Sequence, residues 1–331
     1  MQAVLLVGGF GTRLRPLTNT TPKQMLPVGH RPMIERVLEH LCDHGVERAV
    51  LSLGYRPDAF QDAYPDGRCA GVALHYAIES EPLDTAGAIR FAAIDGGVTE
   101  RFLVVNGDVL TDLDIAALVA FHEASGAEGT IALHAVEDPS AFGVVPTEAD
   151  GRVTAFIEKP PRHQAPTNRI NAGTYVLEPS VLDRIAPGGP VNVERVTFPA
   201  MVADRTLFAL DGDAYWIDAG TPTTYLAANL DLLNGRRSRE SGIHPEAHID
   251  GEVVTSVVGS GAHVGLGATV ENSVVFPGAR IDSGAQVRDA IIGTRASIGS
   301  GAVLEAGTVV GDEAIVPPGA VLRGGRIPDE T

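Results

Sequence analysis

The chain opens with Ala3-Val-Leu-Leu-Val7, followed by Gly8-Gly-Phe-Gly-Thr-Arg-Leu-Arg-Pro-Leu-Thr18. The first five residues predict a short buried strand. The glycines that end it predict a turn whose backbone N–H groups can face phosphate oxygens. The turn lacks the Gly-Lys-Ser/Thr of a P-loop, and Leu14 stands where a dinucleotide fingerprint needs its third glycine. The stretch therefore predicts a strand and ligand-binding loop of neither common type.

Beyond this stretch, strand-like and helix-like segments alternate as far as about residue 233. The predicted strands cover 49–53 and 102–106, with a pair at 143–146 and 153–158 around a turn at 148–151. The predicted helices cover 32–44, 85–93 and 114–125, the last with Asp114 as its N-cap. This alternation predicts an α/β domain with a Rossmann-like, mostly parallel sheet covered by helices on both faces. Ligands are then expected at the carboxyl ends of the strands.

After residue 242 the sequence follows a six-residue period, with five-residue steps before Ile281 and Ile292. The apolar residues in phase are Val258, Val264, Val270, Phe276, Ile281, Val287, Ile292, Ile298, Leu304, Val310, Val316 and Leu322. This period places one apolar residue per short strand inward and stacks the coils into a parallel β-helix, which caps a domain or builds an oligomer. We therefore predict domains at residues 1–233 and 243–331, joined by a polar linker at 234–242.

The charge balance limits the partners that this protein can have. Lys and Arg number 25 against 42 Asp and Glu, a net charge of −17 that argues against nucleic acid or an anionic membrane as partner. Only two of the 25 basic residues are lysines, Lys23 and Lys159. The 2 cysteines are too few for a disulfide framework. With no basic signal-peptide segment and no apolar run of ~20 residues, we expect a cytoplasmic protein whose phosphate ligands are held by local cations or a metal.

The residues that follow the glycines carry a family resemblance. Arg13 and Arg15 are followed by Pro22-Lys-Gln-Met-Leu-Pro27, a pattern similar to the signature of the sugar-1-phosphate nucleotidylyltransferases, or NDP-sugar pyrophosphorylases. Further elements of that family follow in order: Leu83-Asp-Thr-Ala-Gly87, Asn106-Gly-Asp108, Phe142-Gly-Val-Val145, Glu158-Lys-Pro160, Asn171-Ala-Gly173 and Trp216-Ile-Asp-Ala-Gly-Thr221. The resemblance covers residues 1 to about 233. It implies the nucleotide-diphospho-sugar transferase fold, with the repeats forming a left-handed parallel β-helix.

The resemblance implies a reaction in which a nucleoside triphosphate and a sugar 1-phosphate give an NDP-sugar and pyrophosphate. The attacking phosphate oxygen is already ionised, so catalysis depends on positioning and charge neutralisation rather than on a general base. The family positions place Arg13 at the triphosphate and leaving pyrophosphate, Lys23 at the α-phosphate and Lys159 at the sugar phosphate. Both lysines of the chain thus match phosphate-binding positions. Arg15 could instead pair with a surface acid.

The resemblance also implies ligands for a metal, the sugar and the nucleotide. It assigns Mg²⁺ to Asp108 and Asp218, although each carboxylate could instead cap a turn or helix. The sugar hydroxyls are matched to Gly143, Glu158, Asn171 and Thr174, where Asn171 could instead be a bulge residue that satisfies its own backbone. The nucleotide, with its base near residues 79–87, is matched to Leu6, Gly8, Gly9, Gly11, Thr12, Asp84, Thr85 and Gly87. Asp84 replaces a common glycine and either selects an unusual nucleotide or points to solvent.

Several substrates and functions remain open from the sequence. Residues 79–87 resemble the mannose-1-phosphate guanylyltransferase subgroup, whereas 22–27 are more similar to glucose-1-phosphate thymidylyltransferases. We favour GTP and mannose 1-phosphate, with thymidylyl or uridylyl transfer to glucose 1-phosphate as the alternative. A non-catalytic regulatory paralogue that binds an NDP-sugar is a second alternative. Acyl transfer by His244, His248 or His263 beside the repeats is a third. Paired β-helices or sheets predict a homo-oligomer.

Overall fold

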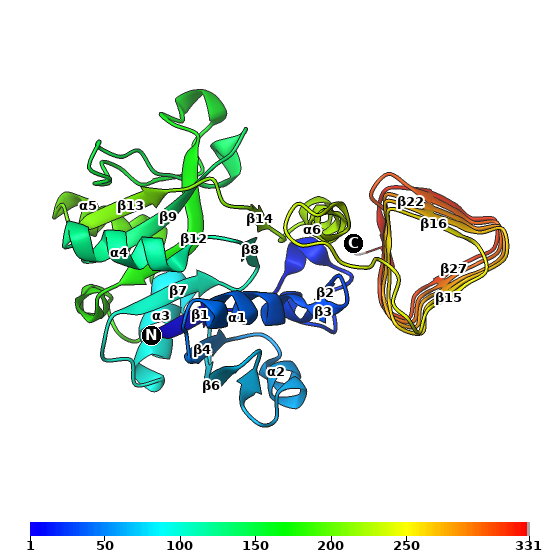
Figure 1. Ribbon diagram of the computed structural model, residues 1–331, viewed down its shortest axis with the longest axis horizontal. Coiled ribbons are helices and arrows are strands. Elements are labelled where there is room, and N and C mark those ends of the chain that lie inside the picture. The colour runs from blue at the N-terminus through cyan, green and yellow to red at the C-terminus, as the bar shows by residue number, and fades with distance from the viewer. Residues whose placement is uncertain (330–331) are drawn as a thin grey trace. The chain divides into compact units, whose positions relative to one another are not determined.

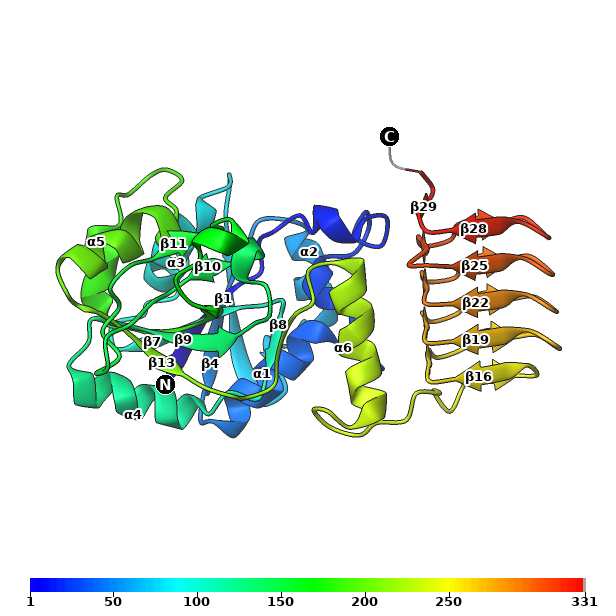
Figure 2. The same ribbon diagram turned by 90° about the horizontal axis from the view of Figure 1, so that it is seen from above.

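The computed structural model describes residues 1–329, which divide into two compact units. The first unit contains Met1–Gly9 and Ile34–Trp216, and the second contains Phe10–Met33 and the chain from Ile217 onward. Figures 1 and 2 follow the chain by colour from the blue N-terminus to the red repeats. These units are defined by packing rather than by sequence order, so the domain limits at residues 233 and 243 stay a prediction.

A ten-stranded sheet forms the centre of the first unit. Strand β1 (Gln2–Leu6) pairs in parallel with β4 (Arg48–Leu53) on one side and with β7 (Phe102–Asn106) on the other. These strands are apolar on both faces, as expected for parallel strands that helices cover on both sides. The remaining strands are β5 (Arg68–Cys69), β6 (Val72–Ile78), β9 (Gly129–Ala135), β10 (Gly143–Val144), β11 (Ile157–Glu158), β12 (Arg169–Leu177) and β13 (Leu207–Asp211). Because β12 runs antiparallel to β7 and β9, the sheet has a parallel centre and a mixed edge.

Helices cover both faces of this sheet, with α3 (Asp84–Asp95) and α4 (Ile115–Ser125) on opposite sides in Figure 2. Helix α3 buries Ile89 against Val4 and Val104 of the sheet. Helix α4 begins after Asp114, whose side chain accepts the N–H of Ala117, so the predicted N-cap is confirmed. The other helices are α1 (Met33–Asp43), α2 (Pro57–Ala63) and α5 (Phe198–Ala203), with a π-turn at Val193–Thr197. The predicted α/β architecture is confirmed.

The repeats of the second unit form a left-handed parallel β-helix with three five-stranded parallel sheets. Figure 1 shows its triangular cross-section, and Figure 2 shows the stacked coils. The first sheet contains β15 (His248–Ile249), β18 (His263–Val264), β21 (Arg280–Ile281), β24 (Ser297–Ile298) and β27 (Ile315–Val316). The second contains β16 (Glu252–Val254), β19 (Thr269–Glu271), β22 (Gln286–Arg288), β25 (Val303–Glu305) and β28 (Val321–Arg323). The third contains β17 (Val257–Val258), β20 (Val274–Val275), β23 (Ile291–Ile292), β26 (Val309–Val310) and β29 (Arg326–Ile327).

One position of the predicted six-residue period was wrong. Strand β20 places Val275, not Phe276, in the core of the β-helix, so the five-residue step falls between Val270 and Val275. Phe276 is also buried, but its ring lies outside the coil and packs edge-on to Tyr225, with 6.2 Å between ring centroids. In the sequence, Val275 and Phe276 are consecutive bulky apolar residues, and the repeat pattern allows either one to face inward. Packing outside the β-helix decides between them.

The second unit also contains a non-repetitive part. This part comprises β2 (Pro27–Val28), β3 (Arg31–Pro32), α6 (Pro222–Asn234) and the loop at residues 10–26. The Tyr225 hydroxyl donates to the Pro27 carbonyl oxygen, and the Asn229 side chain accepts the N–H of Gly29 at 2.8 Å. These bonds tie α6 to the segment that follows the glycines. The short strands β8 (Val109–Thr111) and β14 (Trp216–Asp218) complete the strands of the described chain.

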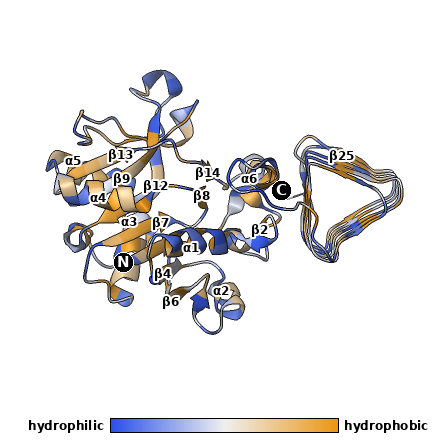
Figure 3. Ribbon diagram, viewed as in Figure 1, coloured by the Kyte–Doolittle hydropathy of each residue, from blue (hydrophilic) through white to orange (hydrophobic). Residues whose placement is uncertain are grey.

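The hydropathy of the residues follows this architecture. In Figure 3 the central strands of the sheet are mostly hydrophobic, and the exposed loops are mostly hydrophilic. Within residues 1–329, no helix combines the length and the apolar character that crossing a membrane requires.

Candidate active site

Gly8 lies beside the ends of two neighbouring strands of the first unit. A Cβ atom at this position would stand 3.1 Å from the backbone nitrogen of Gly54 and 3.4 Å from Oε1 of Glu79. A larger side chain would therefore fill the space beside the Glu79 carboxylate. Leu6, half-buried at the end of β1, packs against the core, and a Cβ atom at Gly9 would meet nothing within 4 Å. The glycines keep this end of the sheet open.

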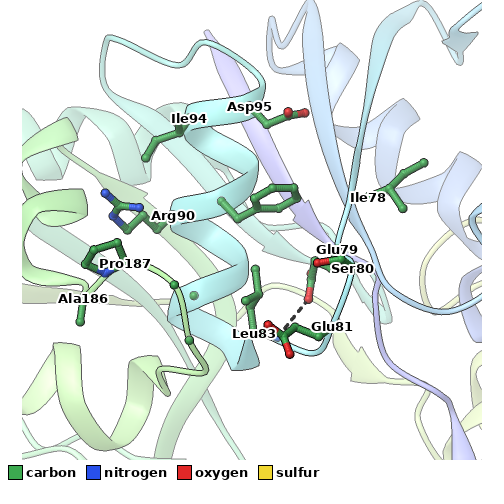
Figure 4. A pocket seen from close by; sticks show the side chains of 14 residues that line it. Ile78, Glu79, Ser80, Glu81, Leu83, Arg90, Ile94, Asp95, Ala186 and Pro187 are labelled. Atoms are coloured by element: carbon green, nitrogen blue, oxygen red, sulfur yellow. Dashed lines mark hydrogen bonds between the residues drawn. The ribbon is translucent and has the colours of Figure 1, made fainter.

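The carboxylate of Glu79 is held from two sides. The Ser52 hydroxyl donates to Oε1 at 2.7 Å. The N–H of Leu83, in the turn ahead of α3, donates to Oε2 at 3.2 Å, and this bond is the dashed line in Figure 4. Each oxygen keeps acceptor capacity, because an ionised carboxylate has about four lone-pair sites. Glu79 lies in the range predicted to be near the base, but it was not singled out as a site residue. An acidic residue directly after a strand is the signal that could have identified it.

A cavity of about 360 Å³ lies beside the first turns of α3 (Figure 4). It is lined by Glu79, Leu83 and Gly87 together with the loop at residues 186–189. A Cβ atom at Gly87 would stand 3.0 Å from the carbonyl oxygen of Gly189. Glycine at this position therefore allows α3 to pack closely on that loop.

Asp84 and Thr85 are tied to the π-turn at Val193–Thr197 and to the residue before it. Asp84 has a left-handed backbone, with φ of 56°, which costs a glycine far less than other residues and fits the family glycine at this position. Its carboxylate accepts the N–H of Thr85 at 2.7 Å and the Asn192 side-chain amide at 3.1 Å. The Thr85 hydroxyl donates to Glu194 at 2.9 Å and accepts the N–H of Val193. Both side chains thus already have protein partners.

The predicted sugar-binding strands lie side by side at one edge of the sheet. Gly143 of β10 is paired with Glu158 of β11, and a Cβ atom at Gly143 would stand 2.6 Å from the ring of Phe156 and 3.3 Å from Oε2 of Glu158. Only glycine therefore fits beside this carboxylate. Lys159 follows with a left-handed φ of 48°, and its ammonium group lies 3.1 Å from Oε1 of Glu158. The Lys159 side chain is 60% exposed, so the ammonium group is accessible to a phosphate.

Asn171 lies at an irregularity of β12, where the pairing register with β9 shifts. Its side-chain oxygen accepts the N–H of Gly173 at 2.9 Å, and its amide nitrogen donates to the Tyr175 hydroxyl at 2.8 Å. The amide thus satisfies its own backbone and is oriented by Tyr175 as well. Thr174 is buried and lines a small cavity of about 10 Å³ with Trp216.

Tyr175 is buried in the first unit, within reach of the charges of three carboxylates. Burial raises the pKa of the Tyr175 hydroxyl far above its usual range, and the charges of Glu194, Glu158 and Asp108 raise it further. Burial also raises the pKa of the Glu194 carboxyl, more than the backbone and Thr85 hydrogen bonds lower it. Tyr175 is therefore protonated at neutral pH.

Arg13 and Asp218 lie together in the second unit. The Arg13 guanidinium is 3.9 Å from the Asp218 carboxylate and 61% exposed, so most of its donors face outward. The other Asp218 oxygen accepts the N–H of Gly220 at 2.8 Å. A Cβ atom at Gly220 would be 2.5 Å from the Arg13 guanidinium, so the backbone here approaches the arginine closely. Thr12 is exposed in the same turn.

Lys23 lies next to Gly11. Gly11 has φ of 61°, and its carbonyl oxygen accepts the Thr18 hydroxyl at 2.9 Å. A Cβ atom at Gly11 would be 3.2 Å from Cβ of Lys23. The turn therefore gathers Gly11, Arg13 and Lys23 on one short loop. Arg15 is exposed, and no acidic side chain of residues 1–329 pairs with it.

The two predicted metal ligands, Asp108 of the first unit and Asp218 of the second, are both carboxylates, the ligand type that a hard divalent cation prefers. Asp108 lies half-buried in the turn between β7 and β8, directly after Gly107, whose N–H donates to the Leu6 carbonyl oxygen at 3.0 Å. Asp218 offers a carboxylate that one backbone N–H already orients. In the part of the chain that the structure describes, no cluster of three or more metal-binding side chains occurs. Two carboxylates supplemented by phosphate oxygens and water are a common arrangement for Mg²⁺.

Comparison with known proteins identifies the family. The nucleotidyl transferase family model matches residues 2–235, and the GMPPB C-terminal domain model matches residues 238–329. The mannose-1-phosphate guanylyltransferase of Mycobacterium tuberculosis is 39% identical over 285 residues, which are 82% of this chain and 78% of that protein. A mannose-1-phosphate guanyltransferase of Schizosaccharomyces pombe is 42% identical over 247 residues, covering 73% of this chain and 67% of the relative.

Two solved structures are also similar to this chain. The crystal structure of HddC from Yersinia pseudotuberculosis has a TM-score of 0.60 and 30% identity, covering 69% of this chain and 97% of HddC. The HddC complex with GMP-PN has a TM-score of 0.58 at the same identity and coverage. The chain belongs to the nucleotidyl transferase family. Within it, the chain is a sugar-1-phosphate nucleotidylyltransferase, an enzyme class that generally uses a divalent metal, and the predicted resemblance is confirmed.

Proposed function

We propose that this enzyme transfers GMP from GTP to mannose 1-phosphate and releases pyrophosphate, giving GDP-mannose. The relatives that match most of the chain are named for this reaction, and the HddC structure was solved with GMP-PN. Thymidylyl or uridylyl transfer to glucose 1-phosphate is not favoured.

The observation that carries this proposal is the carboxylate of Glu79 beside Gly8. Guanine has two adjacent donors, the N1–H and the 2-amino group, and a carboxylate can accept both at once. Uracil and thymine have one N–H between two carbonyl oxygens, and adenine and cytosine have a ring acceptor beside their amino group. Of these bases, a carboxylate fixed by Ser52 and Leu83 therefore suits guanine best.

The proposed chemistry is an in-line displacement. A phosphate oxygen of mannose 1-phosphate forms a bond to the α-phosphorus of GTP, and the bond to the β-phosphate oxygen breaks with release of pyrophosphate. Lys23 neutralises charge at the α-phosphate, and the planar fork of Arg13 binds two oxygens of the leaving pyrophosphate. Mg²⁺, which we assign to Asp108 and Asp218, supplies charge neutralisation at the phosphates when bound. Lys159 holds the phosphate of the incoming sugar.

The sugar hydroxyls are assigned to the edge formed by β10, β11 and β12. The Glu158 carboxylate accepts a hydrogen bond from a sugar hydroxyl, and the backbone of Gly143 lies beside it because no side chain intervenes. The Asn171 amide keeps one N–H beyond the one that Tyr175 accepts. Cys42 and Cys69 form no disulfide in the described residues, which suits the cytoplasm, where we place the enzyme. The homo-oligomer stays a prediction.

Pyrophosphate release tests the proposal directly. Five nucleoside triphosphates would be crossed with mannose 1-phosphate, glucose 1-phosphate and N-acetylglucosamine 1-phosphate in the presence of Mg²⁺. We expect the strongest signal for GTP with mannose 1-phosphate. A stronger signal for another pair would refute the substrate assignment. Silence from a folded sample that still binds GDP-mannose would instead favour the regulatory paralogue.

A further inference from the structure

The last coils of the β-helix contact the loop that carries Arg13. The Arg326 guanidinium of β29 donates to the backbone carbonyl oxygen of Arg13 at 2.7 Å. Both residues belong to the second unit, although 313 positions separate them in the sequence. A hydrogen bond from a charged donor is stronger than one between neutral groups, and here it acts on the backbone of a single residue.

Two further contacts join the same coils to the same loop. A Cβ atom at Gly311 would be 2.9 Å from the ring of Pro16, so glycine allows the coil and the loop to touch. The Thr20 hydroxyl donates to Asp312 at 3.0 Å, and the other oxygen of Asp312 accepts the N–H of Thr294 at 2.8 Å. Asp312 thus links its coil both to the adjacent coil and to the loop.

The loop itself has little regular structure to fix its backbone. Arg13 lies in a three-residue 3₁₀ turn, Thr12–Leu14, that follows the left-handed Gly11. Leu14 and Leu17 are fully buried, while Arg13 is exposed. The buried leucines fix the position of the loop. The rotation of the peptide that follows Arg13 depends on hydrogen bonds at its ends, and Arg326 supplies one of them.

We propose that Arg326 is a positioning residue for catalysis, which holds the Arg13 backbone so that its guanidinium faces the triphosphate. This inference rests on the proposed role of Arg13 and gives the β-helix a part in the reaction besides capping or assembly. Arg326 acts only through Arg13 and does not touch the substrate. Its loss should therefore affect GTP and leave the use of mannose 1-phosphate unchanged.

The test compares Arg326→Ala with Arg323→Ala in the full-length enzyme. Arg323 is the matched control, because it lies on β28, is 78% exposed and pairs only at 3.6 Å with Glu305. For Arg326→Ala we expect a loss of roughly tenfold in kcat/KM for GTP, no change in KM for mannose 1-phosphate and an unchanged melting temperature. Arg326→Lys, which keeps a charged donor, should recover most of the activity. Arg323→Ala should behave as wild type.

A double-mutant cycle separates this inference from the proposed function. If Arg326 acts through Arg13, then Arg326→Ala should cause little further loss in an Arg13→Ala background. An undiminished loss there, or wild-type kinetics of Arg326→Ala, would overturn the inference and leave the proposed function intact. If Arg13→Ala itself kept full activity, the assigned role of Arg13 would fail instead. Should Arg326→Ala not fold, Arg326→Met, which keeps much of the length of the side chain but cannot donate, takes its place in the cycle.

Discussion

Replacing Glu79 by Gln tests the proposed recognition of the guanine base by this carboxylate. The carboxylate accepts from Ser52 and Leu83 and, in the proposal, from two donors of guanine. A glutamine has one acceptor oxygen, so its NH₂ group must face either a protein donor or a guanine donor. A bidentate contact to a base discriminates by about 1–3 kcal/mol. We therefore expect kcat/KM for GTP to fall by roughly 5- to 150-fold, with much smaller changes for the other triphosphates.

Inosine triphosphate isolates one of the two contacts, because hypoxanthine keeps the N1–H but lacks the 2-amino group. The wild type should prefer GTP over ITP by about tenfold, the value of one hydrogen bond to a charged acceptor. In Glu79→Gln this preference should shrink to about threefold or less. The control is Glu81→Gln, an exposed carboxylate of the same turn, which should leave both values unchanged. An unaltered GTP-to-ITP ratio in Glu79→Gln would refute the guanine assignment.

Three further predictions concern substitutions in the two units. Lys23→Ala and Asp108→Ala should each lower kcat by about 10²- to 10³-fold under saturating Mg²⁺, with unchanged circular dichroism, because each removes charge stabilisation rather than packing; wild-type kcat would contradict the assignment. Val275→Ala should lower the free energy of unfolding by about 2 kcal/mol, whereas Leu266→Ala, at 75% exposure, should change it by less than about 0.5 kcal/mol in denaturant titrations. Because burial raises the pKa of Glu194, its charged form destabilises the fold, so Glu194→Gln should be more stable than wild type at pH 7. That gain should disappear below the ordinary glutamate pKa of 4.5, and a gain that did not vary with pH would disprove the burial argument.

The sequence was sufficient for most of the architecture, because the relevant signals are local or strictly periodic. The predicted strand at 102–106 coincides with β7, and the helix predicted at 114–125 begins at its predicted cap. The repeat gave the β-helix for the same reason, since each coil repeats the pattern of its neighbour. The repeat pattern was wrong at one position, Phe276. Phe276 packs against Tyr225, more than 40 positions earlier in the sequence, so Val275 faces inward instead.

The site was harder to predict, because its contacts join residues from different strands. Glu79 depends on Ser52, which comes from the adjacent strand β4, and no local pattern pairs them. The role of Asp84 also depended on a distant residue. Asp84 is exposed, as one of the two alternatives has it, and its carboxylate also accepts from Asn192, 108 positions away. A motif identifies which residues matter, whereas the register of the sheet decides what each side chain touches.

The orientation of Asn171 shows how the chain fixes a polar group with its neighbours alone. The backbone N–H of Gly173 needs an acceptor, so the amide oxygen must face Gly173 and the amide nitrogen must face Tyr175. Burial raises the pKa of the Tyr175 hydroxyl, and nearby carboxylate charges raise it further, so at neutral pH the hydroxyl is protonated and no tyrosinate alters this contact. The remaining N–H of Asn171 is therefore a fixed donor, while Glu158, on β11 at the same edge of the sheet, is an acceptor. A sugar hydroxyl can accept from Asn171 or donate to Glu158, whereas a methyl ether could only accept. The edge of the sheet thus favours a free hydroxyl, which supports a sugar phosphate as the second substrate.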